Sequence, residues 1–205
     1  MRKALRLNDW SVKQAIESRP ELAGKKPIGR GLFSAIYEGT KPGRVLKVTV
    51  DDIGYWMLND RCVGLSGKHF PKLYQNFGVI GEIKRGGSAF PIYMFEVERL
   101  EPLAAGSDAR KIARATGNAS YRASLIAGGS RANCYDVLCE LKVPGVARSV
   151  RRALSALRDF ASYFSHGTLD MHMGNFMQRK DGTLVITDPI ANMGIHRKLV
   201  ANRYW

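Results

Sequence analysis

The pattern of apolar and polar positions changes along the chain, from short alternating runs to longer runs with helical spacing. Residues 9–19 place Trp10 and Ile16 before Pro20, which predicts a short helix capped by Asp9. Apolar residues then alternate with polar ones between glycine-containing turns, and this predicts strands. The expected strand-forming segments are 27–39, 44–50, 77–84 and 91–100, with a helix from 52 to about 63. The first hundred residues are therefore expected to form a small antiparallel sheet with one internal helix.

The second half of the chain favours helices. Residues 101–145 are rich in Ala, Gly, Ser and Arg, and suggest helical pieces near 108–115 and 133–142. The next helix is the clearest, because apolar residues recur at spacings of three and four over 146–164. Its other side carries Arg148, Arg151, Arg152 and Arg158. A strand pair at 176–179 and 184–187 follows, joined by a turn at Asp181-Gly182.

Charge and composition restrict the classes of protein to consider. The chain has 205 residues and a net charge of +14, which favours acidic partners such as nucleic acid or acidic protein surfaces. A basic solvated surface without a dedicated ligand explains the charge equally well. Three cysteines without a CxxC spacing suggest reduced thiols. The sequence contains no apolar run long enough to span a membrane and no apolar signal core, so we expect a cytoplasmic protein without membrane attachment.

The most specific chemistry lies near the end of the chain. Asn175 follows Asp170 by five residues, and Asp188 follows Asn175 by thirteen. Phosphoryl transfer uses such a set, since one Asp accepts the proton of the attacking hydroxyl while an Asn and a second Asp hold Mg²⁺. We therefore take Asp170 as the candidate base, and Asn175 and Asp188 as the candidate Mg²⁺ ligands. His172 has two open roles: it reaches the γ-phosphate, or it fixes the loop by hydrogen bonds.

Two upstream features fit nucleotide binding. Gly29-x-Gly31-x-x-Ser34 forms a glycine-rich turn, whose backbone N–H groups approach phosphates closely; such a turn alone is common in ordinary hairpins. Lys47 lies eighteen residues after Gly29 on an apolar strand, where it faces outward at an edge or inward toward phosphate. The candidate nucleotide-binding residues are Gly29, Arg30, Gly31, Leu32, Phe33, Ser34, Ile36, Val45, Lys47, Glu98, Leu100 and Met177.

The usual acidic partner of such a lysine is absent from the sequence. Kinases pair it with a glutamate on the following helix, but no glutamate lies between Lys47 and Glu82. Asp60 comes nearest to the expected helical position, although a solvent-facing role suits it better. Glu98 and Leu100 suit a hinge whose backbone meets the adenine.

These residues resemble a known family. The runs Gly29–Tyr37, Arg44–Val48, Leu169–Met177 and Ile186–Pro189 are similar to those of the early serine/threonine protein kinases of lytic podophages, a family linked to host-transcription shut-off. The resemblance implies a two-lobed, kinase-like α+β fold. We expect an antiparallel-sheet lobe over 1–100 and a short, mainly helical lobe over 101–205, truncated after the metal-binding Asp188. It further implies ATP- and Mg²⁺-dependent phosphorylation of Ser or Thr on host proteins of transcription, RNA processing or translation, in the host bacterial cytoplasm, with autophosphorylation.

Three departures keep other readings open. Thr168-Leu169 and Pro189-Ile190 replace the His-Arg and Phe-Gly that flank the two aspartates in most protein kinases, and only 17 residues follow Asp188. One alternative is a catalytically inactive kinase-like protein that binds a host factor or nucleic acid through its basic surface. The other is a small-molecule kinase of the aminoglycoside type, whose Asp-Leu-His-Pro-Gly-Asn string is similar to Asp170–Asn175.

Overall fold

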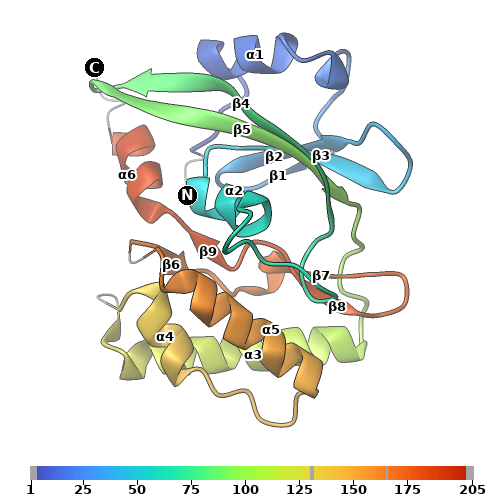
Figure 1. Cartoon of the computed structure of the whole chain (residues 1–205), viewed down its shortest axis with the longest axis vertical. Helices are drawn as coiled ribbons and strands as arrows, with labels where there is room; N and C mark the ends of the chain where they lie inside the picture. The colour runs from blue at the N-terminus through green and yellow to red at the C-terminus, as the bar shows by residue number, and fades with distance from the viewer. Residues whose placement is uncertain (1–3, 130–131, 165, 202–205) are drawn as a thin grey trace. The chain divides into compact units, whose positions relative to one another are not determined.

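The computed structural model describes residues 4–129, 132–164 and 166–201, and its architecture is α+β (Figure 1). The described residues form a five-stranded antiparallel sheet, two small two-stranded sheets and six α-helices. The chain divides into two compact units. Unit 1 comprises the described parts of Met1–Tyr55, Leu73–Arg99 and Asn192–Trp205, and unit 2 comprises those of Trp56–Lys72 and Leu100–Ala191.

This division is more interleaved than the expected single boundary after residue 100. One crossing between the units does fall there, between Arg99 and Leu100. Residues 56–72, however, group with the later helices, and the segment that starts at Asn192 groups with the sheet. A boundary drawn from composition misses both segments, because each is short and belongs to a different unit from the residues that precede it.

The sheet of unit 1 follows the alternating segments expected from the sequence. Its strand order is β1-β2-β3-β5-β4, so β3 is central and β4 is an edge. All of its strand pairs are antiparallel. The strands are β1 (Gly29–Arg30), β2 (Ser34–Glu38), β3 (Arg44–Thr49), β4 (Leu73–Arg85) and β5 (Ser88–Glu98).

The first helix, α1 (Trp10–Glu17), covers part of this sheet. The carboxylate of Asp9 caps it by accepting the Ser11 N–H at 3.1 Å, as the sequence predicts. Ala15 is buried against β4, where a Cβ added at Gly81 would lie 2.7 Å from the Ala15 Cβ. Gly81 therefore allows the helix to approach the strand closely.

Two more helices belong wholly or partly to unit 1. Helix α2 (Asp52–Asn59) begins where β3 ends, and its Tyr55 stacks on Tyr93 of β5 with ring centroids 4.1 Å apart. Helix α6 (Met193–Ala201) was not expected from the sequence. Asn192, just before α6, donates its backbone N–H to Asp51 and its side-chain N–H to Asp52, which ties the start of α6 to the start of α2.

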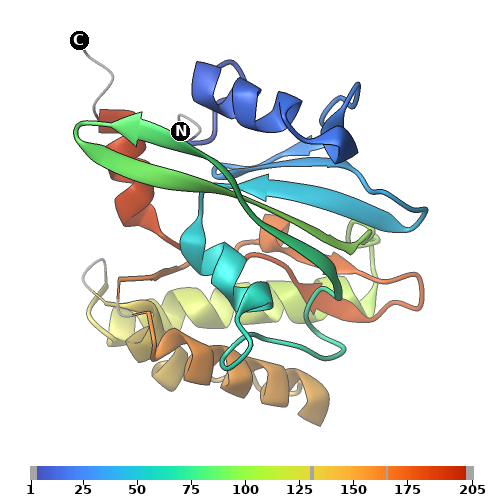
Figure 2. The ribbon, with the colours of Figure 1, turned by 45° about the horizontal axis from the view of Figure 1, so that its top comes forward.

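Unit 2 is mainly helical, as expected, and Figure 2 shows its three helices running beside one another. Helix α3 (Asp108–Ile126) is much longer than the predicted piece; α4 (Cys134–Glu140) and α5 (Arg148–Ala161) match the predicted segments closely. Small residues on α3, such as Ala119, pack against a buried group of valines. Alanine-rich composition hid α3 from a periodicity argument, because alanine marks an apolar face only weakly. The valines are Val143, Val146 and Val150.

Two short ribbons complete unit 2. Strand β7 (Phe176–Gln178) pairs with β8 (Leu184–Ile186), as predicted. Strand β6 (Thr168–Leu169) pairs with β9 (Ile190–Ala191), a pairing the sequence gave no sign of. Gly167 makes the second ribbon possible, since a Cβ there would lie 2.8 Å from Ile190 Cγ2 and 3.0 Å from Cys134 Sγ.

Candidate functional site

The two ribbons of unit 2 bring the predicted catalytic and metal-binding residues together. One loop runs from β6 to β7 and contains Asp170 and Asn175; the other runs from β8 to β9 and contains Asp188. Because β6 pairs with β9 and β7 with β8, the two loops face each other. The backbone N–H of Asp170 donates to the Pro189 carbonyl at 2.7 Å, and that of Thr187 donates to the Asn175 carbonyl at 2.9 Å.

The side chain of Asn175 is oriented by the same loop. Its Nδ2 donates to the backbone carbonyl of Asp170 at 2.6 Å. This bond assigns the amide nitrogen, so the Oδ1 oxygen is the atom left to act as an acceptor or a metal ligand. Asn175 and Asp170 are both half-buried, so the loop is partly shielded from solvent but remains accessible.

His172 caps the short 3₁₀ turn η3 (Met173–Asn175) inside this loop. Its Nδ1 accepts the N–H of Gly174 at 2.9 Å, so the proton of the neutral ring lies on Nε2. Nε2 in turn lies 3.6 Å from Oδ2 of Asp170, which is an electrostatic contact rather than a hydrogen bond. Of the two roles left open by the sequence, the geometry favours loop fixation.

The donor set can be tested for its fit to Mg²⁺. The ion prefers hard oxygen ligands and keeps several waters, and it is bound through one or two protein carboxylates plus substrate phosphates. Asp188 and the Oδ1 of Asn175 supply oxygens of this kind from facing loops. No three His, Cys, Asp or Glu side chains within residues 4–129, 132–164 and 166–201 form a group that could hold a metal. Two protein oxygens of this kind suit an ion whose remaining ligands are phosphate and water.

In unit 1, the strand register places several predicted nucleotide-binding residues in one row. Gly29 pairs with Ile36, Ile36 with Lys47, and Lys47 with Phe95. Paired residues share a face of a sheet, and residues two apart along a strand share it too. Val45 and Ser34 therefore lie on the same face as Lys47.

The same alternation separates two other candidates from this row. Arg30 pairs with Ala35, which pairs with Val48, so Arg30 belongs to the opposite face. Phe33 is buried and its ring contacts His196 of α6 edge-on, with centroids 5.9 Å apart. The side chain of Arg30 therefore lies off this row and that of Phe33 packs against α6, while the expectation that the backbone of Gly29–Ser34 covers a nucleotide stays a prediction.

The turn between β1 and β2 is tight. The N–H of Gly31 donates to the Ser34 carbonyl at 2.9 Å, and a Cβ on Gly31 would lie 3.0 Å from Ser34 Oγ. The carbonyl of Leu32 accepts the N–H of Ala4 at 2.8 Å, so the N-terminal segment lies against the turn. Small residues at 31 and 34 thus serve the turn itself.

Lys47 is an inward-facing lysine rather than an edge residue. It lies on the central strand β3, its side chain is only 8% exposed, and its Nζ lies 5.9 Å from the centroid of the Phe95 ring. Asp60, the acid nearest to the expected helical position, caps a turn instead. It follows α2 and its carboxylate accepts the N–H groups of Val63 and Cys62, which hold the pKa of this carboxyl below its usual value.

The predicted hinge coincides with a passage between the units. Glu98 ends β5 in unit 1, and Leu100 is the first residue of the returning segment of unit 2. One residue further, Glu101 exchanges two backbone hydrogen bonds with Gln178, which anchors the strand β7 that carries Met177. Glu98 and Leu100 thus flank a crossing of the chain between the units, and their role as a hinge stays a prediction.

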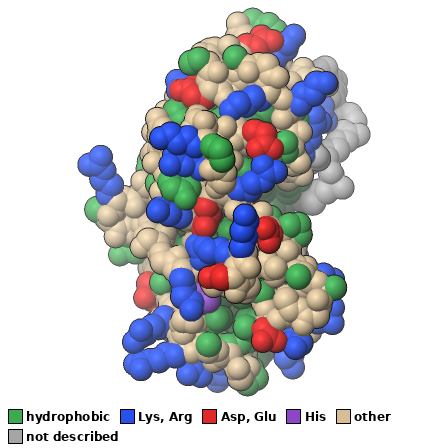
Figure 3. All heavy atoms as spheres, turned by 90° about the vertical axis from the view of Figure 1, so that its right-hand side faces the viewer, with side chains coloured by type: hydrophobic (Ala, Val, Ile, Leu, Met, Phe, Trp, Pro, Cys, Tyr) green, Lys and Arg blue, Asp and Glu red, His purple; other side chains and the backbone are tan. Residues whose placement is uncertain are grey.

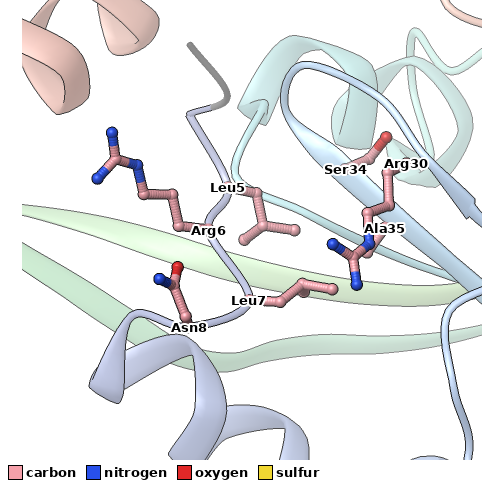
Figure 4. Close-up of a pocket in the computed structure, with 7 residues that line it drawn as sticks. All are labelled: Leu5, Arg6, Leu7, Asn8, Arg30, Ser34 and Ala35. Atoms are coloured by element: carbon pink, nitrogen blue, oxygen red, sulfur yellow. The ribbon is translucent and has the colours of Figure 1, made fainter.

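Unit 1 also has a cavity of about 460 Å³ beside the glycine-rich turn. Residues 5–8 and the β1–β2 hairpin line it (Figure 4). Arg30 and Ala35, from the face opposite to Lys47, line it together with Ser34, which belongs to the Lys47 face. The cavity therefore includes residues of both faces of the hairpin.

The basic charge is dispersed. On the face shown in Figure 3, Lys and Arg side chains occur in many places, with acidic and apolar groups between them. Arg151 and Arg152 are exposed on α5, whereas Arg44 is engaged with the buried Glu96 at 3.0 Å.

The described residues contain no helix that is long and apolar enough to cross a membrane.

Sequence reasoning missed the residues that hold the site together. Pro189 and Thr187 hold the loop that carries Asp170 and Asn175 through backbone hydrogen bonds. Gly117 on α3 is the second case: a Cβ there would lie 2.9 Å from the carbonyl oxygen of Met171. A glycine in the middle of a helix, where it costs stability, was the available signal.

The chain matched no protein-family model and no curated protein.

Proposed function

We propose that this protein is a kinase that uses ATP and Mg²⁺ to phosphorylate serine or threonine on host bacterial proteins during phage infection. The proposal rests on one observation above the others: two facing loops, joined by backbone hydrogen bonds, present Asp170, Asn175 and Asp188 together. Acid, amide and acid in this arrangement suit phosphoryl transfer from a nucleotide.

Each side chain has a separate task in this reaction. The carboxylate of Asp170 accepts the proton of the acceptor hydroxyl as its oxygen bonds to the γ-phosphorus of ATP. The bond from that phosphorus to the β,γ-bridging oxygen breaks, and ADP leaves with the electron pair. Asn175 Oδ1 and Asp188 would hold Mg²⁺, which neutralises phosphate charge when bound. His172 holds the loop through Gly174 and faces the base.

Unit 1 supplies features that suit nucleotide binding. Lys47, Ile36 and Val45 share one face of the sheet, and Lys47 is buried among apolar neighbours. An ammonium group on this face can bind phosphate oxygens through charge-assisted hydrogen bonds. In this proposal Lys47 binds the phosphates, while Ile36 and Val45 contact the base.

The proposal is tested by incubating the protein with γ-labelled ATP and Mg²⁺, with and without bacterial lysate. Wild type is expected to label protein at serine or threonine. Asp170→Asn is expected to lower the rate by about 10²–10⁴-fold, as loss of a general base does. Asp188→Ala is expected to abolish labelling, since it removes a ligand for Mg²⁺.

The matched control is Asp159→Asn, which changes an exposed acid of α5 within the same unit. It is expected to label protein like wild type. Equal labelling by wild type and Asp170→Asn would contradict the proposal. Label found only on small metabolites would instead support a small-molecule kinase, and nucleic-acid binding without any transfer would support a catalytically inactive binding protein.

A further inference from the structure

A groove of about 670 Å³ lies in unit 2, between helix α3 and the loop that carries Asp170. Asp170, Met171, His172 and Met173 line one side of it, and α3 lines the other. Every described residue of the groove belongs to unit 2. A ligand in this groove would therefore lie beside the candidate base.

Helix α3 presents an unusual stripe to the groove. Arg114, Asn118, Tyr121 and Leu125 recur at spacings of four, three and four, so they lie on one side of the helix. Apolar residues at this spacing normally face a core. Here Tyr121 is 68% exposed and Leu125 is 58% exposed, whereas the core side of α3 uses small residues. Those small buried residues are Ala109, Ala113, Thr116, Ala119, Ser120 and Ala123.

Gly117 determines where this stripe lies along the axis of α3 relative to the candidate general base, Asp170. The absence of a side chain lets α3 approach the Met171 carbonyl, to which an added Cβ would lie only 2.9 Å away. Asp170 is thus level with the turn of α3 around Gly117. Arg114 lies toward one end of the groove from that point, and Tyr121 and Leu125 lie toward the other.

The charges of the groove discriminate between acceptor classes. Asp170 is the only acidic side chain among the described lining residues, and Arg114 is the only lysine or arginine among them. A polycationic small molecule such as an aminoglycoside needs several acidic partners, which this lining lacks. A polypeptide with acidic and apolar side chains would find Arg114 for the acid, and Tyr121 and Leu125 for the apolar side chains.

From this we propose that the groove binds the acceptor polypeptide in extended form, with an acidic residue at Arg114 and apolar residues on Tyr121 and Leu125. The inference rests on the proposed function, since the acceptor hydroxyl is placed at Asp170. It puts substrate recognition on α3, upstream of the catalytic loop, rather than on helices that follow Asp188.

The spacing of these residues along α3 predicts which side chains the acceptor polypeptide should carry and at which positions. With a rise of about 1.5 Å per residue, Tyr121 lies about 6 Å and Leu125 about 12 Å along α3 from Gly117, and Arg114 about 4.5 Å the other way. An extended chain advances about 3.3 Å per residue and repeats its facing side every second residue. The preferred acceptor therefore carries apolar residues two and four positions to one side of the serine, and an acidic residue one or two positions to the other.

Peptide binding tests the groove without depending on catalysis. The probes are fluorescein-labelled peptides with one serine, two leucines and one aspartate at these positions, made in both chain directions. Matched peptides carry lysine for aspartate, or serine for leucine. Fluorescence anisotropy is measured with wild type, Tyr121→Ala, Leu125→Ala and Arg114→Glu. Two exposed α3 residues outside the groove supply the controls, Arg122→Glu and Ile126→Ala.

We expect the leucine–aspartate peptide to bind best in one of its two chain directions. Tyr121→Ala and Leu125→Ala should weaken it about tenfold, the size of a typical anchor residue, while both controls stay within about twofold. Arg114→Glu should reverse the preference between aspartate and lysine peptides. Far-UV circular dichroism checks that each variant is folded.

The two proposals fail in different ways. If serine peptides are phosphorylated but Tyr121→Ala, Leu125→Ala and Arg114→Glu behave like the controls, the groove proposal is overturned and the kinase proposal stands. If the peptides bind with the expected preference but receive no label from ATP, the groove stands and the kinase proposal fails. Equal binding of aspartate and lysine peptides by wild type would also overturn the groove.

Discussion

The two regions that carry the candidate site position their residues by different physical means. In unit 2, Asp170, Asn175 and Asp188 lie on loops joined by backbone hydrogen bonds between paired strands. In unit 1, the candidates lie on strands, where alternation sends neighbours to opposite faces of the sheet. Residues that are adjacent in sequence therefore stay together in the loops but are separated in the hairpin. When a motif lies on a hairpin, each of its residues must therefore be assigned to one face of the sheet or the other before it is given a role.

The largest expected effect comes from changing one cation on each face. Lys47→Met should lower the rate of label transfer by about 10²–10³-fold, as removal of one electrostatic stabiliser does. Arg30→Met should change it by less than about threefold, because Arg30 lies on the other face. Transfer rates at saturating ATP and at low ATP provide the measurement. Similar losses in both variants would show that the faces do not separate the roles.

Two glycines give the next contrast, in folding stability. Gly167→Ala should lower the free energy of unfolding by about 1–3 kcal/mol, because the new Cβ would meet buried Ile190 and Cys134 atoms within 3.0 Å. Gly31→Ala meets only the Ser34 hydroxyl, which can rotate away, and should cost less than about 1 kcal/mol. Urea titration followed by circular dichroism measures both. A larger loss for Gly31→Ala would reverse the comparison.

His172 offers a smaller effect that separates its two possible roles. His172→Ala removes the acceptor of the Gly174 N–H and the contact with Asp170. We expect kcat to fall about tenfold with little change in the KM for ATP, since loop order is lost but no nucleotide contact is. A rise in the KM for ATP with unchanged kcat would assign His172 to the γ-phosphate instead.

The smallest effect is a difference in acid sensitivity between the units. Burial lowers the pKa of His69 in unit 2, where the ring contacts the Leu184 carbonyl at 2.8 Å and Ser149 Oγ at 3.0 Å. Burial alone would raise the pKa of Glu96 in unit 1, but hydrogen bonds from Thr40 and Arg44 outweigh it and leave this pKa below its usual value of 4.5.

Both shifts stabilise the folded state at neutral pH, but they disappear in different ranges. The contribution of His69 is complete above the usual histidine pKa of about 6.5 and is lost as pH falls through its lower folded value. That of Glu96 is complete above 4.5 and is lost as pH falls through its own lower value. Urea midpoints from pH 8 to pH 3 should therefore drop in two steps. His69→Gln should remove the upper step and Glu96→Gln the lower one; a single step unaffected by His69→Gln would contradict this assignment.

Much of the secondary structure could be read from the sequence. Alternation predicted the strands of the sheet, and the apolar stripe over 146–164 predicted α5, because each pattern reports a buried face directly. The spacing of Asp170, Asn175 and Asp188 predicted that they lie together. The segments that carry them are short, and short loops leave these polar side chains few other arrangements. Helix α3 was only partly predicted, because its core face is built from alanine.

By itself, the sequence determined most of the succession of strands and helices along the chain, the basic charge and the set of acids with its amide. Those are properties of local pattern and composition. The tertiary structure alone decided that Lys47 is buried on a central strand, that Arg30 belongs to the other face, and that α6 returns to the sheet. It also placed Gly117 of α3 against the loop that carries Asp170. These facts depend on contacts between residues far apart in the chain, and a linear pattern carries no record of such contacts.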